Sequence, residues 1–145
     1  MPKSLTACAL IVMAGFSSVA LAAEEDNPLL AERWQTRPLI ILAKSANDPV
    51  LVQLKTALEE PRNREAFVER DMVLYTVVGD TGDRNDKPLT PAQTEALVRA
   101  LRERPEDQAL VILVGKDGGK KIVQRGGINP AEIFTTIDQM PMRQP

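Results

Sequence analysis

PLIILAKSANDP, residues 38–49, contains the strongest structural signal in the chain. Its first half, Pro38–Ala43, is continuously apolar, which predicts a central strand covered on both faces. Asp48 followed by Pro49 predicts a helix start, because aspartate is a favoured N-cap and proline fits the first helical position. The stretch therefore indicates a buried strand that leads into a helix. The polar residues between them lie where α/β proteins commonly bind ligands.

Strands and helices are predicted to alternate along the rest of the chain. Helices are expected where apolar residues recur at helical spacing behind a capping residue, and strands where β-branched and large apolar residues run together. The polar stretch Gly79–Lys87 is expected to form a loop, and Asp117-Gly118-Gly119 to turn a hairpin whose second strand is a sheet edge. In chain order the expected elements are the strand Pro38–Ala43, a helix from Pro49 to the break at Pro61, a short helix Asn63–Glu69, the strand Met72–Val78, a helix capped by Thr90, the strands Leu110–Val114 and Lys121–Gln124, and a helix capped by Asn129 and stopped by Pro141.

Residues 1–22 have the features of a cleaved signal peptide. Lys3 gives a positive start, Leu5–Leu21 is an apolar run, and Ala20-Leu21-Ala22 has the small-x-small form of a cleavage site. An uncleaved membrane anchor is the alternative, because the run approaches the shortest length that spans a bilayer core. We expect cleavage, which makes the protein periplasmic or secreted. The predicted organisation is a signal peptide at 1–22, a lead-in at 23–37, one domain at 38–140 and a tail at 141–145.

Histidine is absent from the sequence, and the single cysteine, Cys8, would leave with the signal peptide. The mature chain would then have no thiol, no disulfide and no imidazole. That composition excludes Ser-His and Cys-His nucleophiles and the ordinary zinc, haem and copper sites, and we expect no cofactor. The formal net charge of −2 and the aromatic content of 3% argue against nucleic acid as a partner.

The candidate ligand site lies between the first strand and its helix. Lys44, Ser45 and Asn47 are expected to border the helix N-terminus, where free N–H groups favour anions, and Lys116 is expected to approach them from the hairpin. The ligand would be a small anion or a carboxylate-bearing peptide end. The competing and favoured interpretation is a plain capped turn, because Asp48 already occupies the helix start.

Two candidate metal sites compete with simpler interpretations. Asp80, Asp83, Asn85 and Asp86 supply oxygen ligands for calcium, but the spacing fails the EF-hand pattern and favours a solvated loop. Met140-Pro141-Met142 offers soft sulfur to copper, although packing of the chain end is the favoured interpretation. We predict no metal site.

Two further surface features bear on possible partners. Trp34 is expected to pack against the body of the domain, with ligand stacking as the minor alternative. A basic face for a partner protein is a minor alternative to ordinary surface ion pairs, which are the favoured interpretation and contribute little stability. Its residues would be Arg70, Lys116, Lys120, Lys121 and Arg125.

The order of elements, βαβαββα, predicts an α/β fold with a four-stranded mixed sheet and helices on both faces, because strand–helix–strand units cross over right-handedly. This is the thioredoxin-like layout. The chain also resembles P-DUDES, the bacterial domain-of-unknown-function 4174 family. The stretches that carry the resemblance are Arg33-Trp34-Gln35-Thr36-Arg37-Pro38-Leu39, Glu69-Arg70-Asp71-Met72-Val73-Leu74-Tyr75, Val114-Gly115-Lys116-Asp117-Gly118-Gly119 and Met140-Pro141-Met142-Arg143.

The resemblance implies an extracytoplasmic thioredoxin-like domain and no established reaction. Redox chemistry does not carry over, because Lys44–Pro49 lacks the pair of cysteines that such chemistry needs at a helix start. We therefore expect a non-catalytic binding or protein-interaction module, with no membrane contact after signal cleavage, that acts as a monomer. Its partner would be an unknown protein or a small anionic ligand. The alternative is an enzyme that depends on a bound cofactor or on a partner's thiol.

Overall fold

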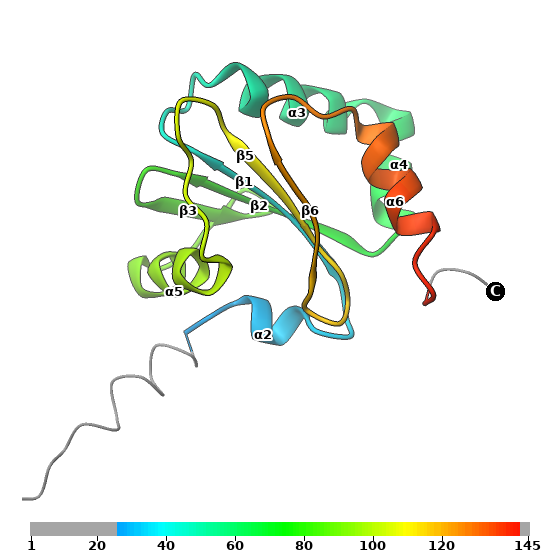
Figure 1. Ribbon diagram of the computed structural model, residues 1–145, viewed down its shortest axis with the longest axis horizontal. Coiled ribbons are helices and arrows are strands. Elements are labelled where there is room, and N and C mark those ends of the chain that lie inside the picture. Colours follow the sequence, from blue (N-terminus) through cyan, green and yellow to red (C-terminus); the bar gives the residue numbers. More distant parts are fainter. Residues whose placement is uncertain (1–25, 143–145) are drawn as a thin grey trace, which may run out of the picture.

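A mixed sheet runs through the centre of the protein in the computed structural model, which describes residues 26–142 (Figure 1). In that part of the chain the sheet has six strands in the order β4-β3-β2-β1-β5-β6. Helices cover both of its faces, so the α/β class is confirmed. The predicted signal peptide, residues 1–22, lies outside the described residues.

Strand β1, Arg37–Ala43, occupies the centre of the sheet, and all seven of its residues are buried. It pairs in parallel with β2, Met72–Val78, and antiparallel with β5, Leu110–Val114. The apolar run at Pro38–Ala43 predicts this placement, because a strand without alternating polar residues needs cover on both faces. Strand β6, Lys120–Arg125, pairs only with β5 and forms the predicted edge.

The prediction of four strands is wrong, because residues 79–87 are not a loop. Strand β3, Thr81–Arg84, continues the sheet beside β2, and β4, Lys87–Pro88, adds a short edge. Tight turns permit this compact meander. Asn85 and Asp86 both have positive φ, 47° and 64°, which is the backbone of a hairpin turn that follows the twist of the strands.

The helices form two layers (Figure 1). Helices α3, Pro49–Glu59, α4, Pro61–Glu69, and α6, Pro130–Asp138, lie on one face, where Leu51, Leu54 and Ile133 pack with Leu39 and Ile41 of β1. Helix α5, Pro91–Leu101, lies on the other face, where its buried Leu97 and Leu101 pack against Ile40 and Leu42. Alternate β1 side chains therefore enter separate cores.

Three of the predicted helix starts are confirmed, and the short helix predicted from Asn63 begins two residues earlier, at Pro61. Asp48 accepts hydrogen bonds from the backbone at the start of α3, Thr90 forms a capping box with Gln93 at α5, and Asn129 accepts from Ala131 at α6. Each cap is followed by proline at the first helical position, which needs no hydrogen-bond donor there. None of the helices within residues 26–142 has the length and apolar character needed to cross a membrane.

The prediction that Trp34 packs against the domain is wrong, because its side chain is 61% exposed. It follows the short helix α2, Leu29–Glu32, in the left-handed region at φ 65°. Its backbone N–H donates to the Lys116 carbonyl at 2.7 Å, and the next two N–H groups donate to the Glu32 carbonyl. These bonds fix the turn so that the indole points outward.

Candidate functional site

The residues predicted to form one anion site lie at two ends of the sheet. Lys44, Ser45 and Asn47 follow the carboxyl end of β1 and are exposed. Because β5 runs antiparallel to β1, the Leu39–Leu113 pairing directs Lys116 toward the amino end of β1. By the rise of an extended strand this separates Lys116 from Lys44 by about 25 Å. The predicted convergence of Lys116 on the other three residues is therefore wrong.

The turn before α3 is closed by its own side chains. Asp48 Oδ1 accepts from the N–H groups of Val50 and Leu51 at 2.9 and 3.4 Å, and Asp48 Oδ2 accepts from Ala109 N–H at 3.0 Å. Ser45 Oγ accepts from the Asn47 N–H at 3.2 Å. The favoured sequence interpretation, a capped turn, matches this geometry, because the helix-start donors already face a carboxylate.

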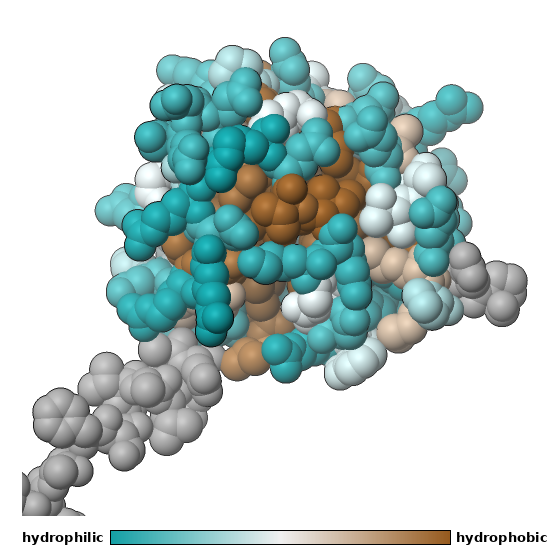
Figure 2. Space-filling view, viewed as in Figure 1, coloured by the Kyte–Doolittle hydropathy of each residue, from teal (hydrophilic) through white to brown (hydrophobic). Residues whose placement is uncertain are grey.

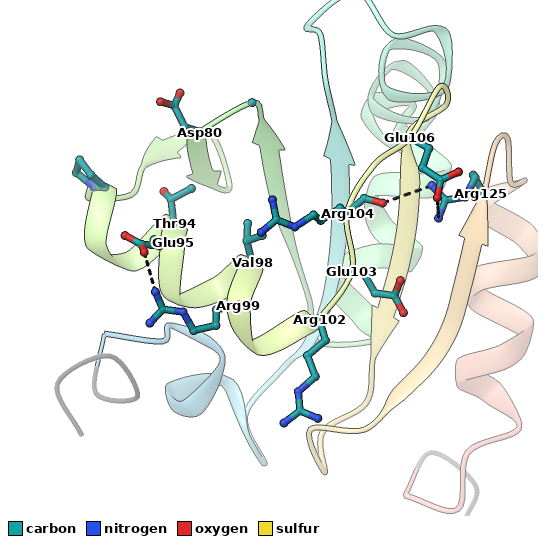
Figure 3. Close-up of a pocket in the computed structure, with 12 residues that line it drawn as sticks. Asp80, Thr94, Glu95, Val98, Arg99, Arg102, Glu103, Arg104, Glu106 and Arg125 are labelled. Atoms are coloured by element: carbon teal, nitrogen blue, oxygen red, sulfur yellow. Dashed lines mark hydrogen bonds and ion pairs between the residues drawn. The ribbon is translucent and has the colours of Figure 1, made fainter. Parts of the chain in front are cut away.

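A cleft of about 890 Å³ opens at the same end of the sheet. Strand β2 ends beside β1 there, and the Gly79 N–H donates to the Ala43 carbonyl at 3.0 Å. The walls are the turn after β2, helix α5, the segment 102–106 and the end of β6 (Figure 3). We call it the arginine cleft and define it by Asp80, Glu95, Val98, Arg99, Arg104, Glu106 and Arg125.

Charges of both signs line the arginine cleft. Arg99 pairs with Glu95 at 2.7 Å, one turn away on the exposed side of α5. Within residues 26–142 the Arg125 side chain makes two long contacts, 3.9 Å to the Glu106 carboxylate and 3.4 Å to the Arg104 carbonyl. Figure 3 shows the Arg104 side chain extending across the cleft toward Val98. No carboxylate within residues 26–142 pairs with Arg104, so its guanidinium is available to an acidic group of a ligand.

Apolar surface gathers next to the cleft. Figure 2 shows it at the centre of the same face, surrounded by hydrophilic side chains, where β6 crosses the view of Figure 1. Val123 of β6 is 46% exposed and contributes to this apolar surface. An apolar centre with a charged rim is the composition of protein–protein interfaces.

A buried polar cluster lies away from the cleft, between α2 and the sheet. The carboxylate of Glu32 is buried, and Oε1 accepts from Tyr75 Oη at 2.8 Å and from Arg84 Nε at 2.6 Å. Glu32 Oε2 accepts from the hydroxyl of Thr36. The sequence gives no local sign of this cluster, because Tyr75 and Arg84 lie far from Glu32 along the chain.

The cluster changes the acidity of its members. Burial acts to raise the pKa of Glu32, but the hydrogen bonds from Arg84, Thr36 and Tyr75 outweigh it and leave the pKa below its ordinary value. Burial, and then the Glu32 carboxylate, raise the pKa of the Tyr75 hydroxyl. Glu32 is therefore ionised at neutral pH with its oxygens occupied, which suits an anchor for α2 better than a general base.

The other candidate residues make ordinary structural contacts. Asn85 Oδ1 accepts from Leu74 N–H at 2.9 Å, and Asp86 pairs with Lys55 at 3.2 Å. Among the described residues no three His, Cys, Asp or Glu side chains are grouped to hold a metal ion. Met140, Pro141 and Met142 line a small cavity of about 60 Å³.

The basic residues proposed as a partner face are each compensated by an acidic side chain. In the described structure Arg70 pairs with Asp138, Lys116 with Asp71, Lys120 with Glu103, Lys121 with Asp117 and Arg125 with Glu106. The face therefore has no excess of positive charge from these five residues, and charge alone does not mark it as a binding surface.

The sequence model of a family described as "Domain of unknown function (DUF4174)" matches residues 28–145. This match covers every helix and strand that the structure describes. No curated protein matches the chain, and no solved structure matches it.

Proposed function

The chain belongs to the family described as Domain of unknown function (DUF4174), and on this premise we propose that it is an exported, thioredoxin-like module that binds a protein partner without catalysing a reaction. The partner would bind at the arginine cleft. The finer family assignment, P-DUDES, is part of the same proposal, as is a periplasmic or secreted location for a monomer.

The arrangement of the inner strands supports the thioredoxin-like part of the proposal. Strands β2, β1, β5 and β6 are consecutive in the sheet, with β1 and β2 parallel and β5 and β6 forming a hairpin that leads to α6. This is the order that the βαβαββα pattern predicts. In this view β3 and β4 are an extension beside β2 and leave the inner four strands unchanged.

The observation that carries the binding function is the composition of the arginine cleft. Val98 lies at its base and charged groups of both signs form its rim, as in an interface with an apolar centre and a polar edge. Arg104 has no carboxylate partner in residues 26–142 and crosses the opening (Figure 3). An acidic side chain of a partner would complete its hydrogen bonds, because guanidinium and carboxylate groups match in geometry.

The residues available for chemistry support binding over catalysis. In a redox member of a thioredoxin-like fold, the thiols would lie at the turn before α3, and this chain has Ser45, Ala46, Asn47 and Asp48 there. Both oxygens of Asp48 already accept backbone hydrogen bonds. The chain has no histidine to act as a base near neutral pH.

The proposal is tested by photo-crosslinking in the native extracytoplasmic fraction. A photoreactive residue replaces Val98 in the cleft or, as the control, Val52, which is 47% exposed on α3 in the other helix layer. We expect discrete crosslinked proteins from position 98 that diminish in an Arg104→Ala background, and none from position 52. Equal labelling from both positions, or no labelling from position 98, would overturn the proposal.

A further inference from the structure

The two edges of the sheet are protected to different degrees. Strand β4 consists of Lys87 and Pro88 only, and a proline has no N–H with which to pair another strand. Strand β6 has six residues and no proline, and no other strand in residues 26–142 pairs with its outer side. A long unprotected edge is a template for the strand of another chain.

Charged lysine side chains guard only the first half of β6, Lys120 and Lys121, against pairing with a strand of another chain. Lys120 Nζ is bound to the Leu101 carbonyl at 2.8 Å, Lys121 Nζ is bound to Asp117 at 2.9 Å, and the pairing with β5 is irregular at this end. The other half, Ile122–Arg125, pairs regularly with Leu110–Leu113. That half is therefore a regularly paired segment with a single charged side chain, Arg125.

The side chains of this half that face α5 are Val123 and Arg125. Val123 pairs with Ile112 and Arg125 pairs with Leu110, and both partners belong to the core on the α5 face. Val123 is 46% exposed, and Arg125 makes the long contacts at the rim of the arginine cleft. An apolar contact point and a cation whose ion pair with Glu106 is long, 3.9 Å, thus stand two residues apart beside the cleft.

We propose that the Ile122–Arg125 half of β6 accepts an extended segment of a partner protein as an added strand. Backbone hydrogen bonds would hold the segment, with an apolar side chain against Val123 and an acidic side chain against Arg125. The inference deepens the proposed function and rests on it, because Arg125 belongs to both the edge and the arginine cleft.

Charge selects an acidic partner strand over a second copy of this chain. An antiparallel pairing of two β6 strands centred on Val123 places Lys121 opposite Arg125. A pairing centred on Gln124 places Val123 opposite Arg125, and β6 has no acidic residue of its own to offer Arg125. Like charges directly opposite one another destabilise a strand pair, whereas a glutamate or aspartate in a partner strand would pair with Arg125.

The test uses the mature chain and three short synthetic peptides. The first alternates valine and threonine, with a glutamate two positions from its central valine. The second has lysine in place of the glutamate, and the third has proline next to the central valine. Binding is followed by NMR titration and by hydrogen exchange of the β6 amides. Val123→Lys is the edge variant, and Val52→Lys is the control, because the two valines are 46% and 47% exposed.

We expect the glutamate peptide to bind saturably at millimolar concentration or below and to slow exchange in Ile122–Arg125. The lysine peptide and the Val123→Lys variant should each weaken binding about tenfold or more, which corresponds to about 1.4 kcal/mol, and the proline peptide should not bind. Val52→Lys should bind like the wild type.

Absence of protection at β6, or equal binding of the glutamate and lysine peptides, would overturn the inference. Self-association through β6 in sedimentation without peptide would also overturn it and assign the edge to a second copy. If position 98 crosslinks a partner while β6 remains unprotected by the peptide, the proposed function stands and strand addition fails. If position 98 gives no crosslink while β6 is protected, the edge binds and the cleft does not.

Discussion

At the scale of single residues, the carboxylate of Glu32 joins three parts of the chain. It accepts hydrogen bonds from Thr36 in its own turn, from Tyr75 in β2 and from Arg84 in β3. The same turn holds Trp34 in the left-handed region, with its indole in solvent. Such a backbone persists only where its surroundings fix it, so the exposed tryptophan depends on the buried carboxylate.

The first prediction concerns this carboxylate. Glu32→Gln should lower the free energy of unfolding by about 2 kcal/mol, because Arg84 loses its charged partner but, at 40% exposure of its side chain, can still reach water. Tyr75→Phe is the matched control, which removes one hydrogen bond and should cost about 1 kcal/mol. Urea unfolding measures both. A Glu32→Gln protein as stable as the wild type would show that the cluster does not anchor α2.

The second prediction concerns pH. The folded-state pKa of Glu32 is lowered, so the carboxylate stabilises the fold fully above its unfolded pKa of about 4.3. This contribution is lost as the pH falls below that value and through the lowered pKa. The stability difference between the wild type and Glu32→Gln should therefore be constant from neutral pH to about 5 and shrink in more acidic solution. A difference that grows on acidification would contradict this sign.

The pH comparison also controls for a second acid with a lowered pKa, Asp117. The Gly119 N–H and the Lys121 ammonium lower the pKa of Asp117 at the β5–β6 turn. Asp117 is present in both the wild type and Glu32→Gln and lies far from residue 32 along the chain. Its titration therefore cancels in the difference between their free energies of unfolding.

At the scale of elements, the hairpin of β3 and β4 shows what turn chemistry adds to a sheet. Asn85 and Asp86 take positive φ without glycine, which asparagine and aspartate tolerate better than most residues. The Asn85 side chain also accepts from the Leu74 N–H, so it fastens the turn to β2. The two positions therefore differ, because glycine at 85 would remove a hydrogen bond to the β2 backbone, whereas glycine at 86 would remove an exposed contact with Lys55.

The third prediction follows from this difference. Asp86→Gly should stabilise the protein by about 0.5 kcal/mol, because Asn-Gly is the preferred sequence for this turn and the positive φ of 64° costs glycine nothing. The lost ion pair with Lys55 matters little, since the Asp86 side chain is 77% exposed. Lys55→Met removes the same pair and serves as the control. Thermal unfolding that shows Asp86→Gly less stable than Lys55→Met would contradict the prediction.

At the scale of the whole molecule, the inner fold could be predicted from the sequence because its signals are local. The apolar run at Pro38–Ala43 predicts the buried central strand, and Asp48-Pro49 predicts the helix behind it. The strands at residues 81–88 were beyond this kind of inference, since their polar side chains show no period of two. The Glu32 cluster depends on pairings that no local pattern encodes.

The candidate site shows the same limit. The end of the sheet where the polar turn of Lys44 and Ser45 lies was expected from the sequence to be the functional one, and the arginine cleft opens there. The expected approach of Lys116 fails because β5 is antiparallel to β1, which places Lys116 beside Trp34 instead. Arg104 carries no sequence signal, since its place in the cleft depends on the path of the irregular segment between α5 and β5.

The fourth prediction belongs to this scale. A protein truncated to start at Ala23, the proposed mature form, should not reduce the disulfides of insulin in the presence of dithiothreitol above the rate of the reductant alone, because it has neither a thiol nor an imidazole. Turbidity of the precipitating insulin chain measures the reaction. Catalytic acceleration by a preparation free of other proteins would contradict the proposed non-catalytic role.

The Glu32 cluster has a consequence for the order in which the protein takes shape. The ribosome makes α2 before every strand of the sheet, yet the partners of Glu32 lie 43 and 52 residues further along the chain. An ionised carboxylate gains nothing from leaving water until those partners exist. The carboxylate of α2 must therefore stay hydrated and become fixed only after β2 and β3 have assembled.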